Sequence, residues 1–358
     1  MSEVWRSIDT GLRPAAQNIA LTRALLEARR AEEISSTLRF LRYAPCALLA
    51  CRQSPAQELD TAYCASAGIA LQRRITGGDT FYCDENQLGW ELYLHRRDVG
   101  IADMGAIAKR ICHAAATAIS ALGVDARFRP RHDIEIDGRV ISRGGGAIDA
   151  DALLYQGILL IESDGGNGQR AVRSPSTPWL AESRLAAHER VTDLATVLGE
   201  RPDVSLIKSN MTAAFESEFE VEFQDGDLSL TEHARYQRAL AEIDAPDWIN
   251  LVHEAADDAP AYVAAQAVAG GILHASLIYD RAARRIKHVR FNDDIGLSPG
   301  RALADLEAAL CDTPVERLTH HVRTFFAGRT VSMPSVMPDD FVAVVRRALK
   351  LPLIAQQS

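Results

Sequence analysis

The residues from Leu71 to Asp84 read LQRRITGGDTFYCD and combine two arginines, a hydroxyl, paired glycines, a thiol and a carboxylate in one short stretch. Paired glycines let a backbone approach a bound molecule closely, while Arg73 and Arg74 place fixed positive charge beside that opening. The chemistry that this combination indicates is binding of a carboxylate or a phosphate. A plain hairpin turn between two strands would use the same glycines, so the glycine pair alone decides nothing.

A second polar stretch, HDIEIDGRVISRGGG, begins at His132 and ends at Gly146. Residues alternate on both sides of Asp137-Gly138, and an Asp-Gly pair in that setting predicts a hairpin with a two-residue turn. The three glycines at 144–146 predict a flexible loop before a strand over residues 153–161. These glycines lack the GxxxxGKS or GxxxxGKT spacing of a nucleotide-binding phosphate loop.

Composition limits the classes of function. The chain has 358 residues, of which 47% are hydrophobic, and its formal net charge is -9. Such a chain can bury a large core, and its acidic balance argues against a general nucleic-acid binder. The six cysteines include no CxxC pair and no Cys/His cluster at zinc spacing, so we expect most of them to be buried free thiols. No apolar run approaches the ~20 residues of a membrane span and no signal peptide is recognisable, so we expect a cytoplasmic protein without membrane contact.

The elements that would position the two polar stretches mix helix and strand. Apolar spacing predicts helices over residues 15–33 and 104–122, the first of them starting after Pro14. Strands are expected over residues 38–43, 47–51 and 88–95, and a short helix over residues 63–70. Near the C-terminus the pattern predicts strands around 277–279 and 288–291 and helices over 299–311 and 339–349. The fold class is therefore α+β, with domains predicted over residues 1–250 and 255–358.

In their order and spacing, several blocks of the chain resemble the lipoate-protein ligase family. The blocks are NIALTRALL (18–26), the loop ending CRQ (51–53), RRITGG (73–78), DIEIDGR (133–139), QGILL (156–160), RVTDL (190–194) and IKHVRFNDD (286–294). The resemblance implies a catalytic domain of the biotin/lipoate ligase type, with a mixed β-sheet and flanking helices. It also implies that the small α+β C-terminal domain is the accessory domain of the long ligases, reached through a hinge between Trp248 and Asp258.

The resemblance implies a reaction as well. In this family lipoate or octanoate attacks the α-phosphate of ATP, usually with Mg²⁺, and the acyl-adenylate is then attacked by a lysine amine of a lipoyl-carrier domain that is H-protein-like or E2-like. No tightly bound cofactor is expected. Asp133 would meet the nucleotide or its Mg²⁺. By position, the residues that would line the acyl-adenylate are Arg74, Thr76, Gly77, Gly78, Asp79, Thr80, Gln156 and Gly157.

The chain departs from the family pattern where the family carries its active-site lysine. The family reads Asp-Gly-Arg-Lys, whereas Val140 follows Arg139 in this chain. Valine cannot stabilise charge on a phosphate, and loss of an oriented cation costs on the order of 3 kcal/mol in a transition state. We expect Arg139 or Arg143 to take over this role.

Further departures are Asp79 for the third glycine of the turn, Cys83 for a histidine, and Gln156-Gly157-Ile158 for a His-Gly-Thr motif. Asp79 places negative charge where a triphosphate would pass.

Two alternatives to an ATP-dependent ligase stay open on the sequence. The first is an octanoyl or lipoyl transferase that uses Cys83 as a thioester-forming nucleophile without ATP, although a cysteine at this place is more often a half-buried strand thiol. The second is a protein that keeps the pocket and binds a lipoyl domain without catalysis.

Overall fold

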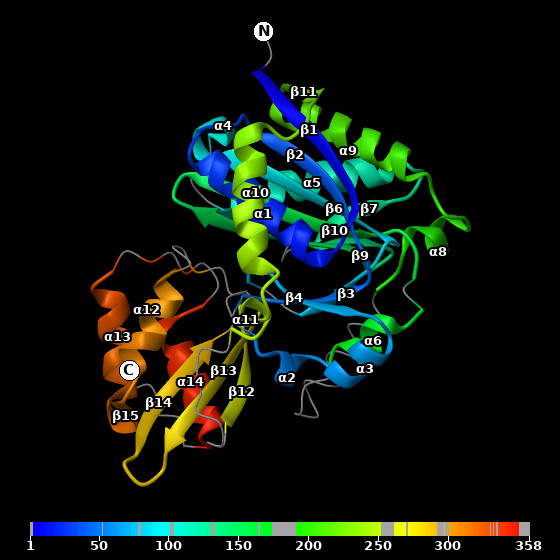
Figure 1. The fold of residues 1–358 in the computed structure, drawn as a ribbon. Coiled ribbons are helices and arrows are strands. Elements are labelled where there is room, and N and C mark those ends of the chain that lie inside the picture. The colour runs from blue at the N-terminus through cyan, green and yellow to red at the C-terminus, as the bar shows by residue number, and fades with distance from the viewer. Residues whose placement is uncertain are drawn as a thin grey trace. The chain divides into compact units, whose positions relative to one another are not determined.

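A computed structural model describes most of the chain. The described residues are 3–51, 53–77, 80–100, 104–129, 133–163, 165–173, 191–251, 261–269, 271–291, 297, 301–329, 331, 333 and 336–350. Two compact units share the chain: the first comprises residues 1–76 and 80–251, and the second comprises residues 77–79 and 252–358. Both units combine helices with a β-sheet, which confirms the α+β class (Figure 1).

The first unit is built on an eight-stranded mixed sheet with the order β11-β1-β2-β6-β10-β9-β8-β7. β1 runs parallel to its neighbours β2 and β11, and the pairs from β2 through to β7 are antiparallel. The strands are β1 (Glu3–Arg13), β2 (Thr37–Tyr43), β6 (Gln87–His95), β7 (Ala126–Arg129), β8 (Asp133–Ile136), β9 (Arg139–Asp149), β10 (Ala152–Leu160) and β11 (Val221–Asp225).

Helices cover both faces of this sheet, which is why the central strands β2 and β6 are buried at almost every position. The helices α1 (Ala15–Arg30) and α10 (Leu230–Ile243) pack together on one face (Figure 1). The helices α5 (Met104–Ser120) and α9 (Val204–Phe219) enclose the main core on the other. Local signals fix the starts of two of them: Pro14 precedes α1, and Ser229 exchanges hydrogen bonds with Glu232 in a capping box that opens α10. The short helices α4 (Arg96–Val99) and α8 (Leu194–Leu198) connect strands and helices at the edges.

A three-stranded sheet with the order β4-β3-β5 lies beside the large one. Its strands β4 and β5 contain parts of the stretch Leu71–Asp84, called here the Gly-Gly stretch. Its strands are β3 (Cys46–Leu49), β4 (Ala70–Arg73) and β5 (Phe81–Cys83), and the short helices α2 (Pro55–Glu58), α3 (Thr61–Ser66) and α6 (Asn167–Ala171) accompany it. The helix α11 (Pro246–Ile249) packs against β4. The strands β4 and β5 each pair with β3 and not with each other, so they are not the two arms of a hairpin.

The second unit is a four-stranded sheet with helices packed on it around a core of its own. The sheet contains β12 (Ala261–Val268), β13 (Gly271–Asp280), β14 (Arg285–Phe291) and β15 (Thr313–Pro314). The helices are α12 (Arg301–Leu310), the 3-10 turn η1 (Val315–Arg317), α13 (Leu318–Ala327) and α14 (Pro338–Ala348).

Two expectations for the second polar stretch have different outcomes. The Asp-Gly turn is confirmed: Ile136 pairs with Arg139, and Asp137 and Gly138 both have positive φ, at 51° and 75°. The flexible loop at residues 144–146 is wrong, because these glycines lie inside the continuous strand β9 and pair with β10. The physical reason at Gly144 is space, since a Cβ there would lie 2.9 Å from the Tyr155 hydroxyl.

Candidate functional site

The Gly-Gly stretch begins with an arginine that has a structural role. Arg73 is buried at the end of β4, and its guanidinium donates to the carbonyl oxygens of Ala50, Cys51 and Gln53 at 3.1, 3.0 and 2.7 Å. It also donates to those of Trp248 and Ile249, at 3.0 and 2.7 Å. The expectation that this charge lies open to a ligand is wrong, because backbone carbonyls surround it. The bonds to α11 also tie the start of the expected 248–258 hinge to β4, and residues 252–258 of that hinge lie outside the described residues.

Arg74 and Thr80 of the same stretch are held by hydrogen bonds to Leu48 of β3 and to Gln53. Arg74 is buried, donates to the Leu48 carbonyl at 3.1 Å and has its guanidinium 4.4 Å from the centre of the Phe81 ring. The Thr80 hydroxyl is 2.5 Å from Gln53 Oε1, an oxygen that also accepts from the backbone of Ala50. Gly77 is half-buried, and Gly78 and Asp79 lie outside the described residues.

A row of residues crosses the large sheet and contacts Thr76 of the Gly-Gly stretch. In the strand register, Arg39 of β2 faces Glu91 of β6, Glu91 faces Gln156 of β10, and Gln156 faces Gly145 of β9. Residues that face each other across neighbouring strands lie on the same side of a sheet, so the four line up on the side that α1 covers. The order of the row is a cation, an anion, an amide and a position without a side chain.

The charged half of the row is buried and every donor in it has a partner. The side chains of Arg39 and Glu91 are 0% and 1% exposed, with Nη1 2.9 Å from Oε2. Arg39 also donates to Thr10 Oγ1 at 3.0 Å and to Asn18 Oδ1 at 2.6 Å. Burial opposes the charge of Arg39 and is the largest single effect, but the Glu91 carboxylate together with Tyr93 and Tyr43 outweighs it, so the pKa of the guanidinium is raised.

Gln156 joins this charged pair to the Gly-Gly stretch. Its Nε2 donates to Glu91 Oε1 at 2.6 Å, and its Oε1 accepts from the Thr76 hydroxyl at 3.2 Å. The carboxylate can only accept, so it determines which end of the amide points toward it. Thr76 and Gln156, which the sequence placed at one site, are thus brought together by a direct contact.

Gly145 and Gly157 are glycines for opposite reasons. A Cβ at Gly145 would meet no described atom within 4 Å, which leaves open space beside Gln156 on the α1 side. A Cβ at Gly157 would lie 2.2 Å from the Trp90 indole, because Trp90 packs against this glycine on the α5 side. A packing requirement therefore accounts for Gly157, which the resemblance had placed at the ligand.

A β-bulge brings Arg143 to the same side of the sheet as Gln156. Glu135 of β8 pairs with Val140 and Ile134 pairs with Ser142, so Ile141 is the extra residue on β9. Positions three apart in a regular strand point to opposite sides, and the extra residue restores Val140 and Arg143 to the same one. Arg143 faces Ile158 of β10, the next residue after Gln156 on that side. Val140 is buried, whereas the Arg143 side chain is 55% exposed.

Asp133 completes this group from β8. It pairs with Arg143 in the register, and its Oδ1 lies 4.0 Å from Arg143 Nε, with the Asp133 side chain 23% exposed. Among the described residues, no three His, Cys, Asp or Glu side chains cluster as a metal site. One half-exposed carboxylate still fits Mg²⁺, which is commonly held by one or two carboxylates together with phosphate oxygens and water. Arg139, just after the turn, is exposed at the far end of β9.

Cys83 is a poor nucleophile in this structure. Its side chain is 0% exposed on β5, directly opposite the equally buried Cys46 of β3. Burial raises the pKa of the Cys83 thiol, and the nearby Arg74 only partly offsets this effect. These observations favour the interpretation as a packed strand thiol.

The described residues include all six cysteines, and they differ in exposure. Cys46, Cys64, Cys83 and Cys112 are buried, Cys311 of the second unit is exposed, and Cys51 is half-buried, which confirms the expectation for most of them. Cys51 lies against the Gly-Gly stretch, because its backbone nitrogen donates to the Thr76 carbonyl at 3.0 Å. Sequence reasoning did not single out this cysteine.

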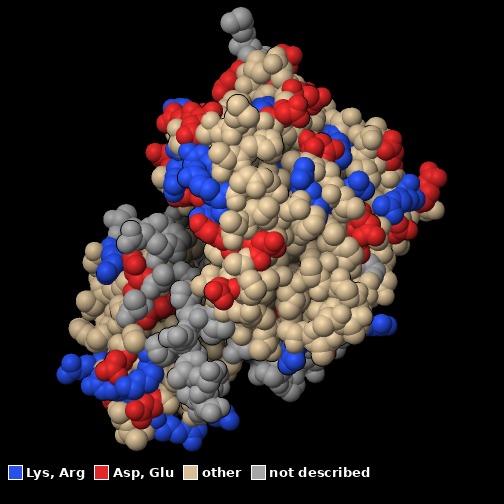
Figure 2. All heavy atoms as spheres, viewed as in Figure 1, with Lys and Arg blue, Asp and Glu red and all other residues tan. Residues whose placement is uncertain are grey.

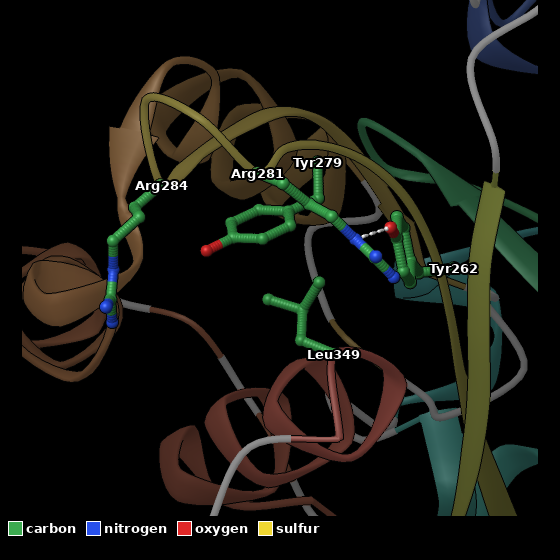
Figure 3. Close-up of a pocket in the computed structure, with 5 residues that line it drawn as sticks. All are labelled: Tyr262, Tyr279, Arg281, Arg284 and Leu349. Atoms are coloured by element: carbon green, nitrogen blue, oxygen red, sulfur yellow. Dashed lines mark hydrogen bonds between the residues drawn. The ribbon is translucent and has the colours of Figure 1, made fainter.

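A cavity of about 290 Å³ lies elsewhere, in the second unit. Tyr262, Tyr279, Arg281, Arg284 and Leu349 line it, and Arg281 reaches the Tyr262 hydroxyl across its rim (Figure 3). None of these five residues has a thiol, carboxylate or amide side chain. We place the candidate site on the large sheet, where an amide, a cation and a carboxylate share one side.

The charged side chains on the surface of the first unit are mixed in sign. On the face shown in Figure 2, acidic and basic side chains are interspersed over the first unit, with no large area of one sign. A uniformly basic face, which nucleic-acid binding requires, is not visible there. Among the described helices, none combines the length and the apolar character needed to cross a membrane.

Comparison with known proteins decides the family. Residues 14–216 match the model of the lipoyl protein ligase A/B catalytic domain. The chain belongs to this family. An octanoyltransferase LipM of Moorella thermoacetica is 25% identical over 268 residues, which cover 69% of this chain and 98% of that protein. The family thus includes enzymes that attach octanoyl or lipoyl groups, and the resemblance noted in the sequence is confirmed.

Solved structures of lipoate ligases share the fold. The LipL1 protein of P. falciparum, solved in complex with lipoate, superposes with a TM-score of 0.71 at 14% identity and covers 96% of this chain and 99% of its own. A bipartite lipoate protein ligase from Thermoplasma acidophilum, studied with its E2 lipoyl domain, superposes with a TM-score of 0.61 at 19% identity over 72% of this chain and 100% of its own. These likenesses confirm the ligase-like fold of the mixed sheet and its flanking helices.

Proposed function

We propose that the protein is an ATP-dependent ligase that joins lipoate or octanoate to a lysine of a lipoyl-carrier domain, H-protein-like or E2-like, through an acyl-adenylate. The observation that carries the proposal is the shared side of the sheet on which Gln156, Arg143 and Asp133 lie next to the open position at Gly145. An amide that can donate, an exposed cation and a carboxylate are the groups that a carboxylate substrate and a nucleotide require.

The residues divide the work of the first step. Gln156 orients the acyl carboxylate, one oxygen of which attacks the α-phosphorus of ATP while pyrophosphate leaves. Arg143 stabilises the negative charge on the α-phosphate oxygens, the task for which Val140 has no charge. Because guanidinium is planar and always protonated, it can hold two phosphate oxygens at once. When Mg²⁺ is bound with Asp133, it neutralises charge on the triphosphate.

The second step transfers the acyl group to the carrier. The lysine ε-amine attacks the acyl carbonyl of the adenylate, an amide bond forms, and AMP leaves with the electrons of the mixed anhydride bond. Gln156 donates to the carbonyl oxygen as negative charge develops on it, and Thr76 keeps the amide in place from the side of the turn.

A transferase is the second candidate, and the exposure of Cys51 favours it. Cys51 is half-buried beside Thr76, whereas the other four cysteines of the first unit are buried. In this alternative the Cys51 thiolate attacks the carbonyl of an octanoyl thioester on a donor carrier and the donor's thiol leaves. A lysine amine of the acceptor then attacks the Cys51 thioester, an amide bond forms and the Cys51 sulfur leaves. The similarity to an octanoyltransferase LipM is consistent with this chemistry.

One assay separates the two candidates. Purified protein is incubated with an apo lipoyl domain and octanoate or lipoate, with and without Mg·ATP, and the mass of the carrier is measured. The ligase proposal predicts a mass increase that requires ATP, that Arg143→Ala lowers about 100-fold and that Cys51→Ser leaves in place. Transfer from an octanoyl-carrier without ATP, lost in Cys51→Ser, would overturn the ligase in favour of the transferase. The variant Cys83→Ala serves as the matched buried-thiol control.

A further inference from the structure

We infer that the buried Arg39–Glu91 pair positions the side-chain amide of Gln156, which in turn binds the substrate. Glu91 accepts one N–H of this amide, and the amide oxygen faces Thr76. The second N–H is left to donate to the acyl group beside Gly145. The inference deepens the proposed function and rests on it for the identity of the acyl group. Glu91 and Arg39 touch no substrate and act through Gln156.

Stability alone does not account for the Arg39–Glu91 pair. A buried ion pair in a well-packed protein is often no more stabilising than apolar residues of the same size. The same strands supply such residues at neighbouring positions, for example Leu38 and Leu92, which are both fully buried. A cation and an anion at 0% and 1% exposure therefore call for an explanation other than stability.

The contacts of Glu91 hold its carboxylate in one orientation. Glu91 Oε2 contacts Arg39 and accepts from the Tyr93 hydroxyl, while Oε1 contacts Gln156 and lies 2.9 Å from Thr22 Oγ1. The carboxylate is gripped at both oxygens and cannot rotate without breaking two contacts. A fixed acceptor of this kind removes the ambiguity of an amide, whose two ends have the same shape.

One N–H group of the Gln156 amide remains for a ligand. The Gln156 side chain has two N–H groups, and among the described residues only Glu91 accepts from it. The side chain is half-buried, lies on the side of the sheet that also carries Arg143, and faces the open position at Gly145. An oriented donor beside empty space fits a carboxylate or thioester oxygen, since it adds no charge of its own.

The test compares Glu91→Gln and Tyr93→Phe with Asp98→Asn, a control that disrupts the other buried ion pair, Arg29–Asp98. The first readout is the side-chain ¹⁵N–¹H resonances of Gln156, identified as those that disappear in Gln156→Met. We expect them to move in Glu91→Gln and Tyr93→Phe, to stay in Asp98→Asn, and to shift when octanoate is added to the wild-type protein. Resonances that octanoate leaves unchanged would overturn the inference.

The second readout is the rate of acyl transfer per folded molecule. We expect Glu91→Gln and Gln156→Met each to lower kcat at least tenfold with a smaller change in KM for octanoate, and the double variant to be no slower than Gln156→Met. Losses that multiply, or an equal loss in Asp98→Asn, would show a general structural role. Tyr93→Phe keeps the test valid if Glu91→Gln does not fold. A protein that shows the octanoate-dependent shift but transfers nothing would contradict the proposed function and leave the inference standing.

Discussion

Two buried ion pairs of the first unit differ in what lies at their ends. Arg29 and Asp98 are 4% and 7% exposed with 2.7 Å between Nη2 and Oδ2, and Asp98 also accepts from Ser36 and from the backbone of His95. This pair fastens the end of α1 to α4, and none of its described contacts reaches the candidate site. The Arg39–Glu91 pair, in contrast, continues through Gln156 to an open position on the sheet. Burial of charge is thus no sign of function by itself, and the connection to an unfilled position is what distinguishes the second pair.

The largest effect is expected when apolar residues replace the Arg39–Glu91 pair. We expect the double variant Arg39→Met/Glu91→Leu to be less destabilised than Glu91→Leu alone and to lose transfer, because no charge stays buried without a partner, whereas the Tyr93 hydroxyl and Gln156 lose their acceptor. The single variant Glu91→Leu should lose about 3–5 kcal/mol, since Arg39 stays buried without its partner. Urea unfolding and the transfer assay measure both. The matched pair Arg29→Met/Asp98→Leu should keep transfer, and its loss there would remove the distinction.

Replacement of Arg143 tests whether the reaction takes place at the end of the row formed by Gln156 and Gly145. Arg143→Ala should lower kcat/KM by about 100-fold, equivalent to roughly 3 kcal/mol of transition-state stabilisation. The free energy of unfolding should change little, because the side chain is 55% exposed and its carboxylate neighbour is 4.0 Å away. Steady-state kinetics with urea unfolding separates the two effects. Arg139→Ala is the control on the same strand, and an equal loss there would point to the general charge of β9.

The two glycines of the facing strands sharpen the contrast between open and packed positions. Gly157→Ala should lower the free energy of unfolding by about 1–3 kcal/mol, because the added Cβ meets the Trp90 ring at 2.2 Å. Gly145→Ala meets no described atom within 4 Å and should fold normally while it weakens octanoate binding. Thermal unfolding and calorimetric titration with octanoate measure the pair. Normal octanoate binding by Gly145→Ala would place the acyl group elsewhere.

The pH dependence of stability gives the smallest effect and concerns the structural pair. Burial would raise the pKa of Asp98, but Ser36 and Arg29 outweigh it and hold that pKa below its usual value. A carboxyl with a lower pKa in the folded state stabilises the protein above its unfolded pKa of about 3.9, and this contribution is lost as the pH falls through the folded value. Unfolding measured between about pH 7 and pH 3 should therefore show a shallower loss for Asp98→Asn than for the wild type. An unchanged slope would contradict this account.

The sequence anticipated the local features of the fold. The Asp-Gly turn, the strand over Ala152–Leu160 and the helices α1 and α5 followed from turn chemistry and apolar spacing, which depend on neighbouring residues only. The same reasoning failed at residues 144–146, where three glycines look like a loop and are a strand. The need for glycine at Gly144 comes from Tyr155 on the next strand, a contact that no local pattern contains.

The candidate site followed the same division. Thr76, Gln156, Asp133 and Arg143 were each named from the sequence, and the structure adds the contact between the first two and the shared side of the last two. Arg39 and Glu91 were missed, although charged residues within the apolar strands LRFLRY and LGWELYL were a signal that could have revealed them. Arg73 was given to the ligand because its sequence cannot show that five backbone carbonyls surround it.

The sequence by itself determined which residues are available for chemistry, the loss of the family lysine at Val140, and the mixed α and β elements. Only the tertiary structure shows that Arg143 lies on the same side of the sheet as Val140. The reason is the bulge at Ile141, which depends on how β8 and β9 pair and returns Arg143 to the side of Val140 and Gln156. The row from Arg39 to Gly145 is likewise a product of strand register, because its members come from β2, from β6 and from the adjoining strands β9 and β10, which are three separate parts of the chain.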